Sequence, residues 1–275
     1  MSIATVALIG FGEVGQVLAA DLKSVTVKTF DLHRPAGCAS ATEAVRDADL
    51  IISAVTAAQT VAAAQSVTTG MKAGAWFMDL NSASPEAKLE ACKTITAATG
   101  RYVEVAVMAP IEPRRLASPM LLGGPHAEGF IPLIQALGFT GASFYSEISG
   151  KASATKLCRS VMIKGLEALI SESLLAARHY GVEDTVLASL NNLFPHPDWG
   201  GYARYMISRT LEHGARRSEE MREAAKTVAE AGLTPWMSNA TAERQAWAPA
   251  YAEALKADGL KPMLDAIRAQ IEIKP

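Results

Sequence analysis

The most constraining feature of this sequence is a glycine pattern that directly follows a short apolar run near the start of the chain. The run Thr5–Ile9 has the apolar, β-branched composition of a buried strand, and the segment Gln16–Leu22 is typical of a helix. Between them lies a Gly-x-Gly-x-x-Gly pattern made of Gly10, Phe11, Gly12, Glu13, Val14 and Gly15. A strand, a glycine turn and a helix in this order predict a dinucleotide-binding site formed by these six residues.

The three glycines have distinct roles in such a turn. Gly10 permits the tight turn after the strand, Gly12 lets the backbone approach a pyrophosphate, and Gly15 lets the helix pack closely on the strand. The phosphates then face the helix N-terminus, where N–H groups and the helix dipole favour negative charge. Because the pattern alone also fits an ordinary glycine turn, the prediction depends on the flanking strand and helix.

An acidic residue follows close to where a ribose-binding acid is expected. The second predicted strand ends at Asp31, whose carboxylate can accept hydrogen bonds from ribose hydroxyls while repelling a 2′-phosphate. His33 and Arg34 come next, and a guanidinium there can clamp a 2′-phosphate, stack on adenine or lie in solvent. We therefore expect NAD as the cofactor, with NADP as the alternative, and we include all three residues in the cofactor site.

Apolar runs alternate with alanine-rich helical stretches through the first half of the chain. This alternation predicts a Rossmann-type α/β fold, in which crossover helices flank a doubly wound parallel sheet. The expected strands are Thr5–Ile9, Val25–Phe30, Leu50–Val55, Trp76–Leu80 and Tyr102–Val107, and the sheet is extended by Met120–Leu122 and Ala142–Tyr145, which flank a helix at Ala127–Leu137.

The strand pattern stops near Ser149, and the rest of the chain is predicted to be all α. A long apolar helix is expected over 150–180, followed by helices at 183–193, 201–231, 235–257 and 260–272. We therefore divide the chain into a dinucleotide-binding Rossmann domain, residues 1–149, and a helical substrate and dimerisation domain, residues 150–275. Apolar residues on several faces of the long helix predict a homodimer.

Composition excludes several classes of partner. A formal net charge of -2 over 275 residues gives no electrostatic footprint for nucleic acid or an anionic membrane, so a small-molecule substrate is favoured. Every apolar stretch is shorter than the roughly 18 to 20 residues that a membrane span needs. The three cysteines lie far apart, and the histidines lack metal-ligand spacing. These features predict a cytoplasmic protein without a bound metal.

Three further motifs follow the glycine pattern in a characteristic order. Ser53-Ala54-Val55-Thr56 ends the third predicted strand, Asp79-Leu80-Asn81-Ser82-Ala83-Ser84-Pro85 follows the fourth, and Gly150 precedes Lys156 in the long helix. This order resembles that of the β-hydroxyacid dehydrogenase and 6-phosphogluconate dehydrogenase superfamily along most of the chain. The stretch from Lys156 to Leu169, with the later Arg217–Met221, looks most like the poorly characterised phosphogluconate-dehydrogenase-like branch of that superfamily. The resemblance implies the two-domain fold and hydride chemistry, with Ala54, Val55 and Thr56 on the nicotinamide side of the cofactor.

The family's substrate loop is altered in this chain. Family members carry Pro-Val-Ser-Gly-Gly, whose serine hydroxyl and backbone amides hold the substrate carboxylate, whereas the aligned segment here is Ala106-Val107-Met108-Ala109-Pro110. The usual carboxylate cradle is therefore expected to be absent. Arg114 and Arg115 can replace it with a bidentate clamp or lie in solvent. We expect six residues at the substrate, namely Asn81, Ser82, Met108, Ala109, Ser160 and Lys164, with Ser160 standing where the family has asparagine.

Hydride transfer needs a titratable group beside the reacting carbon, and the resemblance assigns this role to Lys156. The side chain is expected to reach an interdomain cleft, and the alternative is a surface lysine. Lys156, Ser160 and Lys164 are spaced by four residues and follow one stripe of the helix. Two ammonium groups on that stripe would disfavour each other's charge and lower a lysine pKa toward the operating range. Alternatively, Lys164 pairs with Glu167 or Glu172.

Together these observations predict an NAD(P)-dependent dehydrogenase or reductase. It would transfer a hydride between nicotinamide and a small alcohol or carbonyl substrate of hydroxy-acid type, with a lysine as general acid/base. One alternative is an imine reductase, since that group shares the architecture, although imine-reducing relatives usually carry Asp or Tyr at the position of Lys156. The other alternative is a non-catalytic dinucleotide-binding regulator in which the altered loop has lost turnover.

Overall fold

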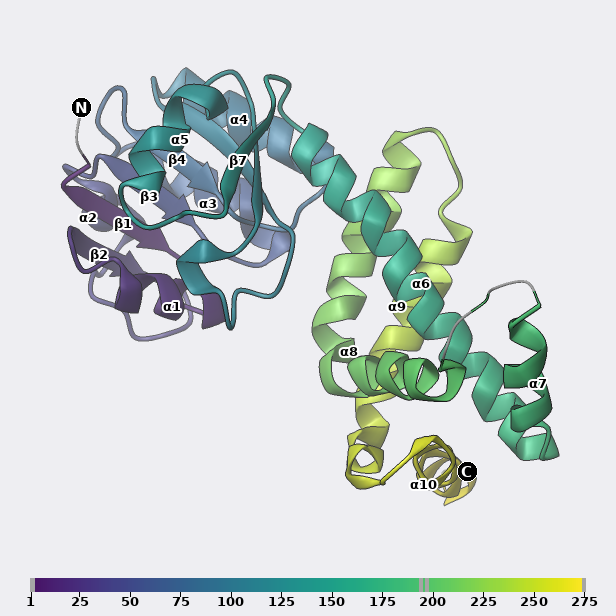
Figure 1. The fold of residues 1–275 in the computed structure, drawn as a ribbon. Coiled ribbons are helices and arrows are strands. Elements are labelled where there is room, and N and C mark those ends of the chain that lie inside the picture. Colours follow the sequence, from purple (N-terminus) through teal and green to yellow (C-terminus); the bar gives the residue numbers. More distant parts are fainter. Residues whose placement is uncertain (1–2, 193–194, 196–197, 274–275) are drawn as a thin grey trace. The chain divides into compact units, whose positions relative to one another are not determined.

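One seven-stranded sheet organises the first half of the molecule. The computed structural model describes residues 3–192, 195 and 198–273, and within them the strand order is β2-β1-β3-β4-β5-β6-β7 (Figure 1). The strands are β1 (Thr5–Ile9), β2 (Thr26–Phe30), β3 (Leu50–Ser53), β4 (Trp76–Asp79), β5 (Arg101–Val107), β6 (Met120–Gly123) and β7 (Ala142–Ser146). Each begins and ends within two residues of a strand expected from the sequence.

The direction of the strands places the carboxyl ends of β1 to β5 at one edge of the sheet. These five strands are parallel to one another, whereas β6 runs antiparallel to β5, and β7 is parallel to β6. The sequence does not predict this reversal, because an apolar run does not encode the direction of its strand. The chain places β2 on one side of β1 and β3 on the other, so the strand order reverses at β1. Ligands of such sheets usually bind at the carboxyl edge of this switch point.

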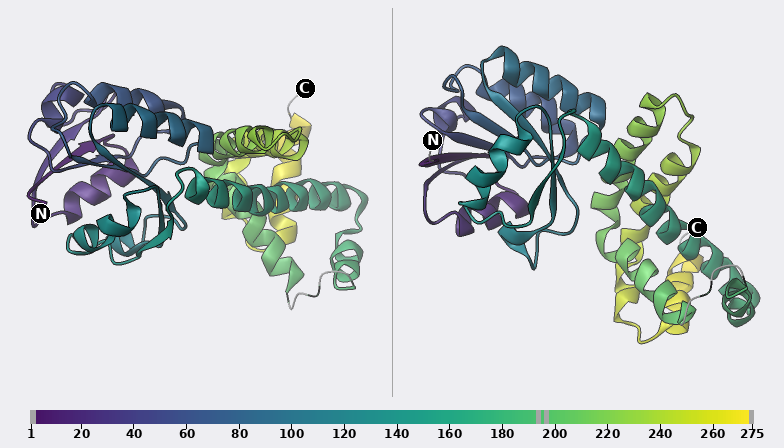
Figure 2. Two further views of the ribbon diagram at one scale, coloured as in Figure 1. Left: turned by 90° about the horizontal axis from the view of Figure 1, so that it is seen from above. Right: turned by 45° about the horizontal axis from the view of Figure 1, so that its top comes forward.

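Helices cover both faces of the sheet because alternate strand residues point to opposite sides. Val6 and Leu8 belong to one buried core, and Ala7 and Ile9 belong to the other. The first core includes residues of α1 (Glu13–Asp21) and α5 (Ala127–Gln135), and the second includes residues of α2 (Ala41–Val45), α3 (Thr60–Val67) and α4 (Pro85–Ala97). The left view of Figure 2 shows these two helix layers on opposite faces.

The second half is helical throughout its described residues. Its elements are α6 (Lys151–Tyr180), α7 (Glu183–Leu190), α8 (Trp199–Glu230), α9 (Trp236–Trp247), the 3₁₀ helix η3 (Ala248–Lys256) and α10 (Leu260–Ile273). The chain forms two compact units, the first up to Leu157 and the second from Cys158, so the division falls inside α6. Among the described residues, none of these helices combines the length and apolar character that a membrane span requires.

The predicted fold class, a Rossmann-type sheet followed by an all-α region, is confirmed. The expected helix over 235–257 is instead α9 followed by η3, and within η3 the backbone at Tyr251 leaves helical geometry, with φ -117° and ψ 18°. Tyr251 is buried, and its ring centroid lies 4.4 Å from that of Trp247. The break thus accompanies core packing that a hydrophobic pattern does not reveal. Residue 193, the expected end of another helix, lies outside the described residues.

Candidate functional site

The glycine loop between β1 and α1 has the geometry that its pattern predicts. Gly10 has a φ of +102°, and a Cβ there would lie 2.4 Å from the carbonyl oxygen of Ala54. A Cβ on Gly15 would lie 2.1 Å from the carbonyl oxygen of Gly10, so only glycine allows α1 to approach β1 this closely. Gly12 is the N-cap of α1, and a Cβ there would meet none of the described atoms within 4 Å. The backbone is therefore open on the side of Gly12.

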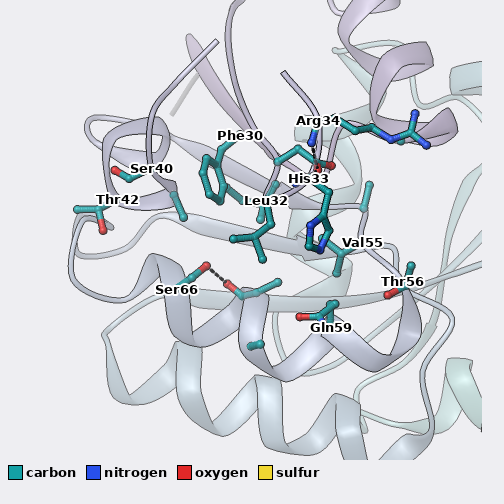
Figure 3. Close-up of a pocket in the computed structure, with 18 residues that line it drawn as sticks. Phe30, Leu32, His33, Arg34, Ser40, Thr42, Val55, Thr56, Gln59 and Ser66 are labelled. Atoms are coloured by element: carbon teal, nitrogen blue, oxygen red, sulfur yellow. Dashed lines mark hydrogen bonds between the residues drawn. The ribbon is translucent and has the colours of Figure 1, made fainter. Parts of the chain in front are cut away.

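A pocket of about 700 Å³ lies beside this loop within the first unit. Eight of the residues expected at the cofactor line it, namely Gly10, Gly12, Asp31, His33, Arg34, Ala54, Val55 and Thr56. Phe11, Glu13, Val14 and Gly15 belong to the same loop and the start of α1 but do not line the pocket. Figure 3 shows Leu32 and His33 on one side of the cavity. Gln59 and Ser66 lie on the opposite side, which α3 forms.

Asp31 is held in the pocket wall by backbone groups. Its Oδ2 accepts a hydrogen bond from the backbone N–H of Phe11 at 2.7 Å, and its Oδ1 accepts from His33 at 2.8 Å and Arg34 at 3.0 Å. Partial burial acts to raise the pKa of the Asp31 carboxyl, but the three N–H donors outweigh it and hold the pKa below its ordinary value. The pocket therefore carries a fixed carboxylate at neutral pH.

Asn81 ties the ends of β3 and β4 together. Its Oδ1 accepts a hydrogen bond from the backbone N–H of Val55 at 2.8 Å, and its Nδ2 donates to Ser53 Oγ at 2.9 Å. The side chain is buried, so both ends of its amide are used in holding Val55 at the pocket wall. The expected contact of Asn81 with a substrate stays a prediction.

Lys156, the expected acid/base, lies at the same edge of the sheet as the pocket loop. Its Nζ donates a hydrogen bond to Ser82 Oγ at 2.6 Å. Ser82 follows β4, and Lys156 lies in the second turn of α6, so the two elements that the resemblance places at the substrate meet within the first unit. Both residues are partly buried. An ammonium held beside a hydroxyl can exchange a proton with a reacting oxygen nearby.

A buried polar network lies beneath the loop that carries Ser82. Asp79, at the end of β4, receives a hydrogen bond from Tyr102 OH at 2.8 Å and pairs with Lys88 Nζ at 2.8 Å. Lys88 also donates to the Asp79 carbonyl oxygen at 3.1 Å and is only 1% exposed. A lysine ammonium is this deeply buried only where its donors are satisfied. The network therefore fixes the start of the loop.

The altered substrate loop lacks the donors of the family's cradle. Met108 and Ala109 are partly buried just beyond β5. The N–H of Met108 is used in a hydrogen bond to the Pro119 carbonyl at 2.9 Å, and Pro110 has no N–H. Met108 and Pro110 therefore offer no free backbone N–H at this loop, and the expected loss of the carboxylate cradle stays a prediction.

Arg115 does not provide the bidentate clamp that was one of its two expected roles. Its guanidinium makes two hydrogen bonds to Asp21, at the end of α1, both at 2.8 Å, and a third to Glu112 at 2.6 Å. Since three of its N–H groups are used within the first unit, this arginine joins the segment after β5 to α1. The neighbouring Arg114 is exposed.

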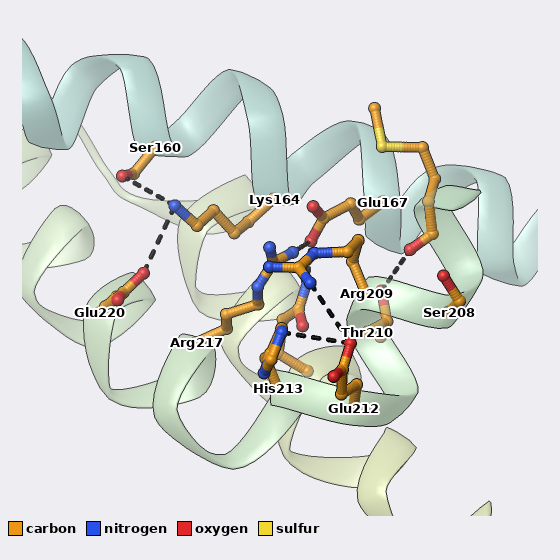
Figure 4. Close-up of polar contacts among 12 residues, drawn as sticks. Ser160, Lys164, Glu167, Ser208, Arg209, Thr210, Glu212, His213, Arg217 and Glu220 are labelled. Atoms are coloured by element: carbon orange, nitrogen blue, oxygen red, sulfur yellow. Dashed lines mark hydrogen bonds and ion pairs between the residues drawn. The ribbon is translucent and has the colours of Figure 1, made fainter. Parts of the chain in front are cut away.

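Ser160 and Lys164, also expected at the substrate, belong to the second unit. There Lys164 Nζ donates to Ser160 Oγ at 3.2 Å and pairs with Glu220 of α8 at 3.3 Å (Figure 4). The alternative in which this lysine pairs with a glutamate of its own helix is therefore wrong. The acidic partner comes from α8, which packing of the helices brings close.

The two glutamates considered as partners of Lys164 form ion pairs with arginines instead. Glu167 is buried and accepts hydrogen bonds from Arg217 Nη1 and, at 3.0 Å, from Gln245 Nε2. Glu172 pairs with Arg244 at 2.5 Å. Both arginines are distant in sequence, so the local i to i+4 spacing could not identify them.

Several residues of the site were missed in the sequence. Gln59 and Ser66 line the pocket from the α3 side, and nothing in their local pattern marks them. Lys88 resembles an ordinary surface lysine of a helix. Glu104 had a usable signal, because a charged residue inside the apolar run Tyr102–Val107 must be buried with a partner.

Comparison with known proteins places the chain among dehydrogenase-like structures. Residues 177–248 match a family model described as a domain of unknown function, DUF1932. A conserved hypothetical protein from Sinorhizobium meliloti 1021 is 35% identical, with 98% of this chain and 97% of that chain covered and a TM-score of 0.80.

Two further solved structures are similar over most of the chain. The conserved protein MTH1747, of unknown function and described as structurally similar to 3-hydroxyacid dehydrogenases, is 27% identical, with 88% of this chain and 96% of that chain covered and a TM-score of 0.69. The 3-hydroxyisobutyrate dehydrogenase of Mycobacterium tuberculosis shares the fold at 18% identity, with 98% and 99% covered and a TM-score of 0.70. On these similarities, the chain belongs to the β-hydroxyacid dehydrogenase superfamily.

Proposed function

We propose that this protein is an NAD(P)-dependent oxidoreductase that transfers a hydride between nicotinamide and a small alcohol or carbonyl substrate. One observation carries the proposal: the open glycine loop and the fixed carboxylate of Asp31 line a single pocket at the switch point of the sheet. Superfamily membership supports the same class of reaction.

The pocket fits a dinucleotide on chemical grounds. A Cβ at Gly12 would project into open space beside the α1 N-terminus, which is where a pyrophosphate needs close backbone approach. The residues that would hold the cofactor are those of the loop from Gly10 to Gly15, together with Asp31 at the ribose. A bound nicotinamide dinucleotide would supply or accept the hydride.

The protein's own part in the chemistry is to hold and move a proton. An alcohol must lose its hydroxyl proton as it is oxidised, and a carbonyl must gain one as it is reduced. We assign this proton to Lys156 Nζ, which Ser82 Oγ holds in place by accepting one of the three ammonium hydrogens. The Asp79 carboxylate accepts a hydrogen bond from the backbone N–H of Asn81, and the Asn81 side chain holds Val55, so the backbone just before Ser82 is fixed.

The cofactor preference is assigned to NAD because Asp31 stays ionised in the pocket wall. Replacing Asp31 with alanine removes both a ribose acceptor and a charge that repels a 2′-phosphate. We expect weaker NAD binding and a shift toward NADP, measured by titrating both cofactors into the variant. An unchanged ratio of the two dissociation constants would show that Asp31 does not select the cofactor.

The experiment that tests the function is a steady-state screen of alcohols, hydroxy acids and imines with both cofactors, followed by the absorbance of the reduced nicotinamide. On the best substrate, Lys156→Ala should keep cofactor affinity and lower kcat by roughly 100-fold, the usual contribution of a positioned general acid/base. Lys151→Ala is the matched control, because Lys151 is an exposed lysine of the same helix and points about 140° away from Lys156.

Three outcomes of the screen would contradict the proposal in different ways. Turnover of imines alone would favour an imine reductase. Cofactor binding without turnover of any substrate would favour a dinucleotide-binding regulator. Equal kcat values for the Lys156→Ala and Lys151→Ala variants would leave the oxidoreductase class standing but would remove the lysine from its mechanism.

A further inference from the structure

Glu104 is a buried carboxylate that the proposed chemistry does not use. It lies on β5, is 0% exposed, and stands opposite Asp79 in the register of β4 and β5. Its two oxygens accept hydrogen bonds from the backbone N–H groups of Gly150 and Ser153, at the start of α6. The first N–H groups of a helix have no partner within the helix, so Glu104 caps α6 from a distant strand.

A second contact ties the same turn of α6 to the loop after β4. Ser153 Oγ donates a hydrogen bond to the Ala83 carbonyl oxygen. Ala83 is the neighbour of Ser82, whose hydroxyl receives the Lys156 hydrogen bond at 2.6 Å. Lys156 follows Ser153 by three residues and therefore lies on the same side of the helix. The first turn of α6 is thus anchored at two points, and the contact between Lys156 and Ser82 is one turn further along.

The surroundings of Glu104 show what its side chain contributes. Burial raises the pKa of the Glu104 carboxyl, and the Lys88 ammonium only partly opposes this. A Cβ on Gly123 would lie 3.2 Å from Glu104 Oε2, so the carboxylate is closely enclosed. The fold does not favour the charge of this group. What the site uses is a pair of acceptor oxygens at the correct place for two N–H donors.

We propose that Glu104 is a positioning residue for Lys156. By capping α6 it sets the place of the first turn on the sheet, and with it the distance from Lys156 Nζ to Ser82 and to a substrate oxygen. This inference rests on the proposed function, in which Lys156 carries the proton. Displacing a reacting group by about 1 Å can reduce a rate by about 100-fold, so loss of this cap has a measurable consequence.

The test is Glu104→Gln, which keeps the shape of the side chain but turns an NH₂ group toward one of the two N–H donors. We expect kcat to fall by about 10-fold or more on the best substrate, with the dissociation constant of the cofactor unchanged. Amide hydrogen exchange should become faster at the start of α6. In the double variant with Lys156→Ala, kcat should equal that of Lys156→Ala alone, because Glu104 acts through the lysine.

Asp49→Asn is the matched control. Asp49 also accepts two backbone hydrogen bonds, from Ala4 and Thr5, and pairs with Lys72, but it precedes β3 and lies at the opposite edge of the sheet. The same chemical change there should leave kcat unaltered.

Two results would overturn the inference about Glu104 alone: a normal kcat for Glu104→Gln while Lys156→Ala is impaired, or a further fall of kcat in the double variant. The second result would mean a general structural role. A normal kcat for Lys156→Ala would instead remove the lysine mechanism, and the positioning role with it.

Discussion

The two units of this protein use buried charge in different ways. In the first unit, the buried carboxylates of Asp79 and Glu104 accept hydrogen bonds from backbone N–H groups, in addition to the ion pair of Asp79 with Lys88, and so fix a loop and a helix start. In the second unit, Glu167 pairs with the side chain of Arg217 from α8 (Figure 4) and also accepts a hydrogen bond from Gln245 of α9. Burying a charge is costly unless it is paired. The first network therefore holds the loop before Ser82 and the first turn of α6 in place, whereas the second joins helices.

The largest expected effect is in the second network. Glu167→Ala leaves the Arg217 guanidinium buried without its carboxylate, and we expect the free energy of unfolding to fall by about 3–5 kcal/mol. Urea unfolding measures this. The double variant Glu167→Leu/Arg217→Met should recover much of the loss, because it removes both charges. If folded Glu167→Ala also bound the cofactor more weakly, the two networks would not be independent.

The next largest effect is expected at the glycine loop of the first unit. Gly12→Ala adds a methyl group that meets none of the described atoms, so stability without cofactor should be unchanged. The methyl group would occupy the place where the pyrophosphate approaches, and we expect cofactor affinity to fall by at least about 10-fold. Gly129→Ala is the matched control, since a Cβ on Gly129, within α5, also meets open space. It should gain about 0.5–1 kcal/mol of stability and bind cofactor normally. Normal binding by Gly12→Ala would mean that the loop does not hold a pyrophosphate.

The first unit was largely predictable because its constraints are local in sequence. The need for glycine at Gly10 and Gly15 follows from contacts inside one strand-turn-helix unit, and the position of Asp31 follows from the length of that unit. Strand positions followed from short apolar runs between turns. The antiparallel β6 was not predictable, since strand direction depends on how the connection from β5 folds back.

The polar partners were harder to predict because they join distant segments. Lys164 pairs with Glu220, 56 residues further along, and not with a glutamate one turn away. The amide of Asn81 holds Val55, a partner 26 residues away that the motif around Asn81 does not reveal. Glu104 could have been recognised as a buried acid, but its partner at Gly150 depends on where α6 begins over the sheet.

A smaller effect concerns the outer face of α6 in the second unit. Met162, Leu166 and Leu169 are 64%, 36% and 54% exposed and recur at the spacing of one helix stripe. We propose that this stripe pairs with its own copy in a homodimer, because a two-fold axis brings like surfaces together. Leu169→Glu should shift the protein toward monomer in light scattering. Leu89→Glu, at an exposed leucine of α4, is the control. A monomeric parent protein at micromolar concentration would contradict the proposal.

The smallest expected effect is at an exposed ion pair of the second unit, where charge should matter least. Arg178 donates two hydrogen bonds to Asp265, at 2.7 and 2.6 Å, and these hold the pKa of the Asp265 carboxyl below its ordinary value of 3.8. A carboxyl whose pKa is lowered by folding stabilises the folded state above its unfolded pKa, and this contribution is lost as the pH falls through the lowered value. Asp265→Asn should therefore lower Tm by about 1–3 °C at pH 7, and the difference should shrink as the pH falls below 3.8.

Glu253→Gln, in the more exposed pair with Lys256, should change Tm even less, because solvent screens that pair more strongly. A Tm loss for Asp265→Asn as large as that of Glu167→Ala would show that exposed and buried pairs contribute alike in this unit.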